Sequence, residues 1–367
     1  MTTLPLHVLT VVGARPQFVK AATLSRAIAR SGGAARETLV HTGQHFDENM
    51  SEVFFREMSI PKPDHHLRLG GGKHGEMTGA MLGAIEHVII DQKPDWVLVY
   101  GDTNSTLAGA LAAAKLHVPV AHVEAGLRSF NRRMPEEINR VLTDHCSDLL
   151  FTPTLVGEQN LLREGIGPSK IRRCGDVMLD AVRHYEAQAA DRSKILAQLE
   201  LGKGEYVLAT VHRAENTDDP ARLAAILRGL GDLSRAHPVV LPLHPRTRNS
   251  AAKLGIDLAS HPSLRTIDPV GYFDMLVLEA NAGLIATDSG GVQKEAYFVG
   301  VPCITLRDET EWVELVTAGA NVLVGADAER IAREGQSSFR RKIAGEPLYG
   351  DGHAADSILQ ILLGTRG

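Results

Sequence analysis

Short apolar runs alternate along the chain with longer stretches in which apolar residues recur at helical spacing. Runs that predict strands in the first half are Val8–Val12, Thr38–His41, Trp96–Tyr100, Pro119–Val123 and Leu149–Phe151. The second half continues with Val207–Thr210, Val239–Leu243, Gly283–Ala286, Cys303–Leu306 and Asn321–Val324. This alternation is typical of parallel strands that are covered by helices. The pattern predicts an α/β protein with two doubly wound units in tandem.

The join between the two units is expected near Cys174–Asp176, where the first series of strands ends and a helical stretch, Val177–Leu199, begins. A last helix is predicted at Ala355–Leu363 and is expected to return to the first unit. Two domains agree with a length of 367 residues, because a single hydrophobic core usually stops growing at roughly 250–300 residues. The predicted domains are residues 1–174 with 353–367, and residues 175–352.

Composition narrows the class of protein. A hydrophobic fraction of 44% and a charged fraction of 23% are ordinary for a globular protein. The net charge of -5, with both signs interspersed, argues against a nucleic-acid partner. The 3 cysteines and 16 histidines show no metal-ligand spacing, and no apolar stretch is long enough to span a bilayer. We therefore expect a cytoplasmic protein with reduced thiols, no metal and no membrane segment.

The first strand–helix junction suits an anion. Gly13 permits a tight turn, Pro16 fits the first turn of a helix, and Arg15 and Lys20 add positive charge beside the helix N-terminus. A plain turn with two solvated cations is the alternative for this segment alone. Neither the dinucleotide fingerprint nor the P-loop occurs here, which disfavours hydride transfer and ATP hydrolysis.

A second anion site is predicted where the strand at 283–286 leads into Asp288-Ser289-Gly290-Gly291 and a helix. Ser289 and the amides of Gly290 and Gly291 are suited to phosphate oxygens, with the helix N-terminus behind them. Glu295, one turn further on, is suited to a ribose diol. The alternatives are a simple helix cap for the Ser-Gly-Gly segment and a surface position for Glu295.

Acidic residues gather where ligands bind in open parallel sheets, outside the carboxyl ends of the strands. Asp102 and Glu124 directly follow predicted strands, and Glu136 lies in the first turn of a helix that begins at Pro135. Capping competes with catalysis at Asp102. Stabilisation by the helix dipole, or pairing with Arg140, competes with it at Glu136 and its neighbour.

Polar residues also follow the strands of the second half. His212 and Arg213 come after the strand at 207–210, and His244 follows the next strand. Because these strand ends share one edge, the three side chains are candidates for contact with a phosphate or a substrate.

At these residues the chain resembles the non-hydrolysing UDP-N-acetylglucosamine 2-epimerases over essentially its whole length. The resemblance is carried by Gly13-Ala14-Arg15-Pro16 with Lys20, Gly43-Gln44-His45, Gly101-Asp102-Thr103, the segment 122–128, the segment 135–140, His212-Arg213, the segment 287–295 and Tyr349-Gly350-Asp351-Gly352. It implies two Rossmann-like domains of the glycosyltransferase-B type with the active site in the interdomain cleft. It also implies a homodimer and a UDP-sugar substrate.

In that family C2 of the sugar is inverted by anti elimination of UDP to a 2-acetamidoglucal, followed by re-addition, so no redox cofactor is expected. The resemblance implies that Asp102, Glu124 and Glu136 are the acid–base carboxylates and that His212 lies near the phosphates or acts as an acid. The implied substrate-binding residues are Arg15, Lys20, Arg140, Arg213, His244, Ser289, Gly290, Gly291 and Glu295. Individual proton-transfer roles stay open.

The chain departs from the common family pattern in three places: Gln17 replaces a Glu, Trp312 replaces an Arg, and the segment 129–134 is short. These departures resemble the branch that acts on UDP-2,3-diacetamido-2,3-dideoxy-glucuronate. Interconversion of UDP-GlcNAc and UDP-ManNAc is the expected reaction. The alternatives are the same epimerisation of the uronate, for which Arg128, Arg132 or Arg133 would supply a cation, and a glycosyltransferase of the same fold.

Overall fold

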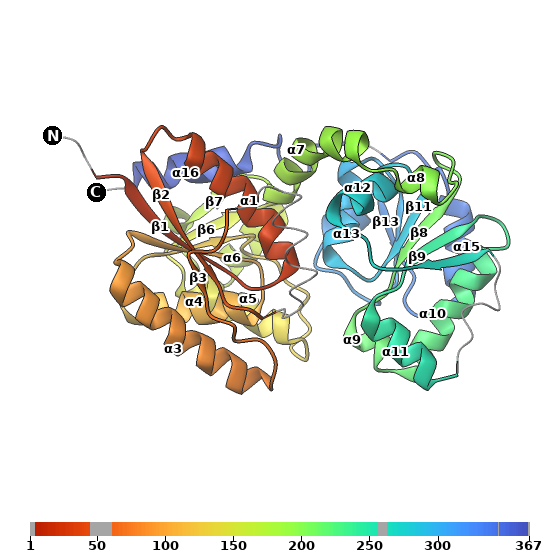
Figure 1. Ribbon diagram of the computed structural model, residues 1–367, viewed down its shortest axis with the longest axis horizontal. Helices are drawn as coiled ribbons and strands as arrows, with labels where there is room; N and C mark the ends of the chain where they lie inside the picture. Colours follow the sequence, from red (N-terminus) through yellow and green to blue (C-terminus); the bar gives the residue numbers. More distant parts are fainter. Residues whose placement is uncertain (1–3, 45–60, 256–262, 344, 366–367) are drawn as a thin grey trace. The chain divides into compact units, whose positions relative to one another are not determined.

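The structure is a computed structural model that describes residues 4–44, 61–255, 263–343 and 345–365. The chain forms two compact units, Met1–Arg183 with Pro347–Gly367 and His184–Glu346 (Figure 1). The domain boundaries predicted at 174 and 353 stay predictions.

The first unit contains a parallel sheet with the strand order β3-β2-β1-β4-β5-β6-β7 in the described residues. The chain runs outward from β1 in one direction and then from β4 in the other, so the order reverses between these neighbours. The strands are β1 (Leu6–Val12), β2 (Ala35–His41), β3 (His65–His66), β4 (Trp96–Tyr100), β5 (Val120–Val123), β6 (Leu149–Thr152) and β7 (Ile171–Arg173).

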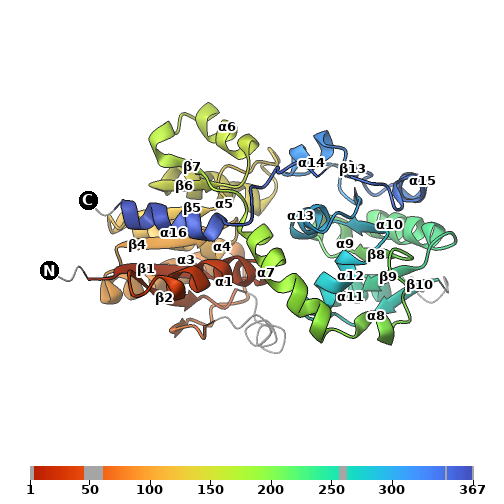
Figure 2. The same cartoon turned by 90° about the horizontal axis from the view of Figure 1, so that it is seen from above.

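Helices cover this sheet, and the C-terminal helix of the chain packs against the N-terminal one. Figures 1 and 2 show α16 beside α1, and Arg30 Nη2 lies 3.0 Å from Asp356 Oδ1. The helices are α1 (Arg15–Arg30), α3 (His74–Gln92), α4 (Asn104–Lys115), α5 (Pro135–Cys146), α6 (Leu155–Arg163), the 3-10 helix η1 (Pro168–Lys170), α7 (Val177–Arg192) and α16 (Ala354–Gly364). Helix α7 continues across the boundary into the second unit.

The core of the first unit explains its apolar strands. All seven residues of β1 are buried, as are all five of β4. Val11 and Val99 pack in one cluster with Ile85 and Ile89 of α3. A central parallel strand is covered on both faces, so it needs a continuous apolar run and not an alternating one.

The second unit repeats the plan with the strand order β10-β9-β8-β11-β12-β13 in its described residues. The order reverses between β8 and β11. The strands are β8 (Val207–Thr210), β9 (Val239–Pro242), β10 (Leu264–Ile267), β11 (Leu284–Thr287), β12 (Cys303–Thr305) and β13 (Asn321–Leu323). The helices are α8 (Ile195–Gln198), α9 (Ala214–Thr217), α10 (Pro220–Leu233), α11 (Pro245–Lys253), α12 (Tyr272–Ala280), α13 (Gly290–Phe298), α14 (Val313–Thr317) and α15 (Ala328–Ser338).

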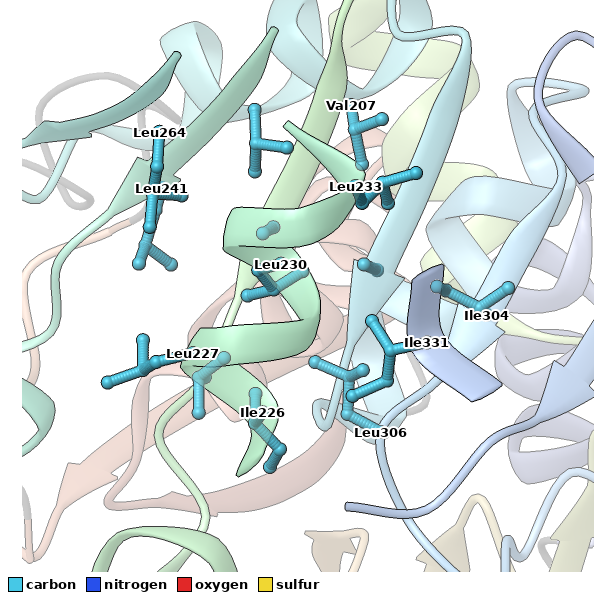
Figure 3. Close-up of a cluster of buried hydrophobic side chains, with 14 of the residues drawn as sticks. Val207, Ile226, Leu227, Leu230, Leu233, Leu241, Leu264, Ile304, Leu306 and Ile331 are labelled. Carbon is cyan, nitrogen blue, oxygen red and sulfur yellow. The ribbon is translucent and has the colours of Figure 1, made fainter. Parts of the chain in front are cut away.

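Helix α10 supplies much of the second core. Asp219 caps it by accepting hydrogen bonds from the amides of Ala221 and Arg222, and Pro220 occupies its first position. The helix then turns one apolar face inward, with Ile226 and Leu230 against the sheet, in the cluster that Figure 3 shows. The predicted class of two doubly wound α/β units is confirmed.

Candidate functional site

Nearly all of the candidate residues follow the carboxyl ends of strands, as the sequence predicted. In the first unit Lys20 lies on helix α1, which follows β1, and the loops after β4 and β5 carry Asp102 and Glu124. In the second unit the loops after β8, β9 and β11 carry His212, Arg213, His244 and Ser289, and Gly290 and Gly291 begin the helix that follows β11. Each group lies at the edge where the order of strands reverses, which is where open α/β sheets bind ligands.

Lys20 and Glu124 form a buried ion pair beside Gly101. Lys20 Nζ donates to Glu124 Oε2, and the two residues are 8% and 7% exposed. A Cβ atom on Gly101 would lie 3.4 Å from Lys20 Nζ and 3.5 Å from Glu124 Oε2, so the ion pair lies directly beside this glycine. The ammonium group offsets the cost of burying the carboxylate.

The backbone of Glu124 is in the left-handed region with φ 72°. Few residues with side chains adopt this conformation, and it costs about 1–3 kcal/mol unless the surroundings impose it. The amides of Glu124 and Ala125 both donate to the carbonyl of Phe151 on β6, at 3.0 and 3.1 Å. The loop is thus anchored to the sheet while it turns the Glu124 carboxylate towards Lys20.

Asp102 is held by a second cation. Arg140 Nη2 donates to Asp102 Oδ2 at 2.5 Å, and Arg140 Nη1 donates to Glu137 Oε2 at 2.9 Å. Arg140 is 2% exposed. Asn139 Nδ2 also donates to the carbonyl of Asp102 at 2.9 Å. Helix α5 therefore fixes both the side chain and the backbone of Asp102, and Arg140 positions a carboxylate.

The two glutamates in the first turn of α5 differ in their surroundings. Glu137 accepts hydrogen bonds from the amides of Ser129 and Phe130, each at 2.9 Å, in addition to the bond from Arg140. Glu137 thus ties the segment at 129–130 to the first turn of α5. Glu136 is half-buried, and its carboxylate stays the candidate for chemistry on this helix.

A charged network lies behind these loops. Asp144, fully buried on α5, accepts from the amide of Gly126 at 3.1 Å and lies 2.7 Å from both His122 Nδ1 and Arg128 Nη1. Burial alone would raise the pKa of Asp144, but the hydrogen bonds and charges of His122 and Arg128 outweigh it and lower that pKa. The sequence analysis missed this network, because it assigned His122 no role apart from its motif.

Arg128 does not fit a carboxylate on the substrate. It is 3% exposed, and its guanidinium contacts Glu164 through two nitrogens at 2.7 Å as well as Asp144. These contacts hold the pKa of the Glu164 carboxyl below its ordinary value against the effect of burial. Because its guanidinium is already paired inside the protein, Arg128 is the least suited of the three arginines to a carboxylate on the sugar. Arg132 and Arg133 are exposed and stay candidates.

Gln17 also faces the interior and not a ligand. Its Oε1 accepts from the amides of Gly13 and Ala14 at 2.8 and 3.0 Å, and its Nε2 donates to the carbonyl of Tyr100 at 2.8 Å. The residue is 1% exposed. An amide can accept and donate at the same site, which a carboxylate cannot do without a proton. Gln17 therefore joins the loop after β1 to the end of β4.

The N-terminus of α1 is described, but the side chain of Arg15 is not among the described parts of the chain. Pro16 lies in the first turn, as predicted. The predicted contact between Arg15 and a diphosphate stays a prediction.

Asp288 organises the site in the second unit. It has no exposed surface and accepts from the amides of His212 and Arg213 at about 3 Å, and from Asn216 Nδ2 at 3.1 Å. The sequence analysis gave weight to its neighbour, Ser289, and missed this role. A short polar residue before the helix, at the end of an apolar strand, was the available signal.

Asp288→Asn is expected to lower the free energy of unfolding by about 2–3 kcal/mol, because one of the two acceptor oxygens becomes a donor that faces backbone amides. Urea unfolding followed by circular dichroism measures the change. The matched control is Asp268→Asn, whose carboxylate is 90% exposed and pairs with Arg248 at the surface. We expect the control to change stability by less than about 0.5 kcal/mol; equal effects would contradict the assigned role.

His212 and His244 come together from neighbouring strands. Their ring centroids are 5.7 Å apart, and His212 Nδ1 lies 3.6 Å from Asp288 Oδ1. His244 caps α11, with its Nδ1 accepting from the amide of Arg246 at 3.2 Å. Arg213 begins the short helix α9 beside them as its N-cap. The prediction that these strand ends share one edge is confirmed.

Helix α13 presents its N-terminus at the same edge. Ser289 is its N-cap, with Oγ accepting from the amide of Val292, and Gly290 and Gly291 form its first turn. Glu295 is 7% exposed, and its Oε2 would lie 4.0 Å from a Cβ atom on Gly291, so its carboxylate points back towards the start of the helix. Capping by Ser289 is thus real, and it leaves the glycine amides at the helix start as candidate phosphate donors.

Trp312 lies beside this helix start. Its Nε1 would be 3.3 Å from a Cβ atom on Gly290, and Lys294 Nζ lies 4.1 Å above its ring. Glu311, the preceding residue, accepts from Arg307 Nη1 at 2.9 Å. The replacement of an arginine by Trp312 therefore comes with a cation–π contact to Lys294.

A second buried carboxyl lies behind Glu295. Glu279 on α12 is 1% exposed, and burial, together with the charge of Glu295, raises its pKa well above the ordinary value of 4.5. Its Oε1 has no hydrogen-bond partner among the described residues. The raised pKa favours the protonated, neutral form of Glu279 in the folded protein.

Glu279→Gln is expected to raise stability by an amount that grows with pH. Above pH 4.5 the unfolded chain releases this proton while the folded chain keeps it, so stability falls with rising pH until the folded group ionises. An amide removes that loss. Urea unfolding at acidic, neutral and alkaline pH measures the stability difference between this variant and the wild type, with the exposed Glu329→Gln as control. A difference that does not change with pH would contradict the raised pKa of Glu279.

Two searches of the described residues bear on cofactors and membranes. No group of three or more His, Cys, Asp or Glu side chains is placed to hold a metal ion there. No helix in the same residues combines the length and apolar character that a bilayer span requires.

Comparison with known proteins identifies the family. Residues 27–363 match the family described as UDP-N-acetylglucosamine 2-epimerase. The chain belongs to this family. Its members are isomerases, and the resemblance stated from the sequence is confirmed. The UDP-2,3-diacetamido-2,3-dideoxy-D-glucuronate 2-epimerase of Pseudomonas aeruginosa is 54% identical over 361 residues, which cover 97% of this chain and 99% of that protein.

Solved structures agree with the assignment to this epimerase family. The UDP-GlcNAc 2-epimerase of Methanocaldococcus jannaschii, crystallised with UDP-GlcNAc and UDP, matches with a TM-score of 0.91 at 43% identity, covering 98% of this chain and 99% of that chain. A glycosyltransferase from Rickettsia africae matches with a TM-score of 0.54 at 14% identity, over 99% and 93% of the two chains. The second likeness shows the fold alone, which is of the glycosyltransferase-B type.

Proposed function

We propose that this epimerase inverts C2 of a UDP-2-acetamido sugar by anti elimination of UDP and re-addition to the other face of a 2-acetamidoglucal. The observation that carries the proposal is a pair of carboxylates at neighbouring strand ends, Glu124 with Lys20 and Asp102 with Arg140. Elimination needs a base at C2 and an acid on return, and the two cations hold the carboxylates in fixed orientations for these roles.

The supporting residues fit the remaining demands of this reaction. The Glu124 carboxylate or the Asp102 carboxylate takes the C2 proton, and Glu136 adds a third group of the same chemistry on α5. The leaving diphosphate needs donors that stabilise charge as the C1–O bond breaks. We assign this task to the amides of Gly290 and Gly291, with Ser289 beside them, and to Arg15 and Lys20.

The other candidate residues are likewise assigned to parts of the UDP-sugar. Glu295, pointing towards the helix start, is proposed to accept hydrogen bonds from the ribose diol. Contacts with the phosphates or the sugar are proposed for His212, Arg213 and His244. The alternative role for His212 is that of the acid in the proton transfer. Arg140 is proposed to act on the substrate through Asp102.

We propose the diacetamido uronate as the preferred sugar. Support comes from the 54% identity to the Pseudomonas aeruginosa enzyme over 97% of the chain. The second candidate is UDP-GlcNAc, which is favoured by the 43% identity to the Methanocaldococcus jannaschii enzyme that was crystallised with it. The added carboxylate of the uronate would find a cation at Arg132 or Arg133.

Competition between the two UDP-sugars tests the preference. Both are incubated together with the protein, and the C2 epimers are quantified by NMR. The proposal predicts a ratio of kcat/KM values of at least about 10² in favour of the uronate, less than the roughly 10⁴-fold that an unmatched buried polar group gives, because Arg132 and Arg133 are exposed. Equal turnover, or turnover of UDP-GlcNAc alone, would transfer the assignment to the second candidate.

A further inference from the structure

His122 is a buried histidine whose two ring nitrogens both face acceptors. It lies on β5 with no exposed surface. Its Nδ1 is 2.7 Å from Asp144 Oδ1, and its Nε2 is 2.8 Å from the carbonyl oxygen of Gly101. A carbonyl oxygen has no proton to donate, so the hydrogen between Nε2 and Gly101 belongs to the imidazole.

The hydrogen at Nδ1 is assigned by the surroundings of Asp144. Its second oxygen accepts from the amide of Gly126 and lies 2.7 Å from Arg128 Nη1. Both contacts are made by donors and therefore favour the ionised carboxylate. An ionised carboxylate only accepts, so Nδ1 also carries a hydrogen. The alternative, a neutral ring, would put a bare nitrogen lone pair against an oxygen lone pair at hydrogen-bond distance.

The charges around the ring agree with this assignment. The groups that surround the ring on the α5 side are Asp144, Arg128 and, beyond them, Glu164, which contacts Arg128 at 2.7 Å. On the other side Gly101 separates the ring from the Lys20–Glu124 pair. With His122 positively charged, the two carboxylates, the guanidinium and the imidazolium form a neutral cluster, in which Glu164 is 27% exposed and also lies 3.3 Å from His145 Nε2.

We propose that His122 is a doubly protonated imidazolium that acts as a positioning residue for the two loops bearing Asp102 and Glu124. The ring holds the carbonyl that directly precedes Asp102, and through Asp144 it is bound to Gly126, two residues after Glu124. It therefore sets the separation of the two carboxylates. Its effect on turnover rests on the proposed function, whereas its protonation does not.

His7 provides an internal control, because its hydrogen-bond partners require a neutral ring. It is 3% exposed on β1, where Arg36 Nη2 lies 2.7 Å from its Nδ1 and Thr38 Oγ1 lies 2.8 Å from its Nε2. A guanidinium only donates, so Nδ1 must accept, and the ring is neutral. Burial and the charge of Arg36 lower the pKa of His7 accordingly.

Neutron diffraction from crystals of the wild-type protein at neutral pH tests the protonation directly. We expect deuterium on both ring nitrogens of His122 and on one nitrogen, Nε2, of His7. A single deuterium on His122 would overturn the proposal. A protein that turns over neither UDP-sugar would refute the proposed function and leave this result unchanged.

Kinetics test the positioning role. His122→Gln is expected to lower kcat by about 10²-fold, the effect of misplacing reacting groups by roughly 1 Å, while KM stays within about threefold. Asp144→Asn removes the counter-charge and keeps the shape of the side chain. It is expected to lower kcat to a similar extent with little change in KM, and it replaces the first variant in the test if His122→Gln does not fold. His7→Gln, at the opposite end of its strand from the site, should keep the wild-type kcat. Wild-type kcat in the His122 or Asp144 variant, or loss of stability without a change in kcat, would refute the role.

Discussion

Glu124→Gln is expected to lower the rate of C2 proton exchange by at least about 10³-fold, while the affinity for UDP stays within a few fold. The amide keeps the size of the side chain and its contact with Lys20, but it cannot take a proton from carbon. The left-handed backbone of residue 124 does not depend on the side-chain charge, since the amides of residues 124 and 125 anchor the loop to Phe151. Exchange is measured by NMR, and UDP affinity by calorimetry.

The matched control for this variant is Glu158→Gln on α6, where the carboxylate makes a long contact of 3.6 Å with Arg173 at the surface. It should keep the wild-type exchange rate. Circular dichroism and UDP binding show whether the Glu124 variant is folded. A folded variant that exchanges C2 at the wild-type rate would remove Glu124 from the proposed chemistry.

Gly126→Ala is expected to lower the free energy of unfolding by about 3–5 kcal/mol, a large part of the stability of a typical domain. Gly126 has φ 80°, and a Cβ atom there would lie 2.3 Å from the carbonyl oxygen of Gly157 and 2.7 Å from its carbon. The position of the Cβ atom is fixed by the backbone of residue 126, and the atoms that it meets belong to the backbone of Gly157, so no change of side-chain rotamer relieves the clash. Activity should fall with stability, because the same loop carries Glu124.

Gly165→Ala separates the two causes of this loss. Gly165 has φ 82°, and nothing lies within 4 Å of its added Cβ atom. It should therefore show the backbone strain alone, about 1–2 kcal/mol. Urea unfolding measures both variants. Similar losses in the two would mean that the approach of Gly157 contributes nothing.

The interior strands were predictable from the sequence, whereas the edge strands were not, with the exception of β13. Every predicted run is a strand in the structure, because interior parallel strands must be apolar on both faces. The strands that the prediction missed, β3, β7 and β10, all lie at the edge of a sheet. An edge strand is partly exposed, as β10 is at Arg265 and Thr266, so it shows no apolar run.

The site was predictable as far as each residue's place at a strand end. Asp102, Glu124 and His212 follow strands, and that much depends only on local pattern. What binds each of them depends on long-range contacts, such as Arg140 reaching Asp102 from α5, and a single sequence does not show such contacts. Gln17 illustrates this, since it makes four interior hydrogen bonds that no local pattern reveals, and two of them are donated by the Nε2 group that a glutamate lacks.

The most direct test of the proposed reaction is deuterium incorporation. The protein is incubated with UDP-2,3-diacetamido-2,3-dideoxy-glucuronate, and separately with UDP-GlcNAc, in deuterated water, and C2 of the recovered sugar nucleotide is examined by NMR and mass spectrometry. Elimination and re-addition predict deuterium at C2 in at least one of the two recovered pools and in its epimer. Epimer formed without deuterium at C2, or no incorporation from either sugar, would contradict the proposed reaction.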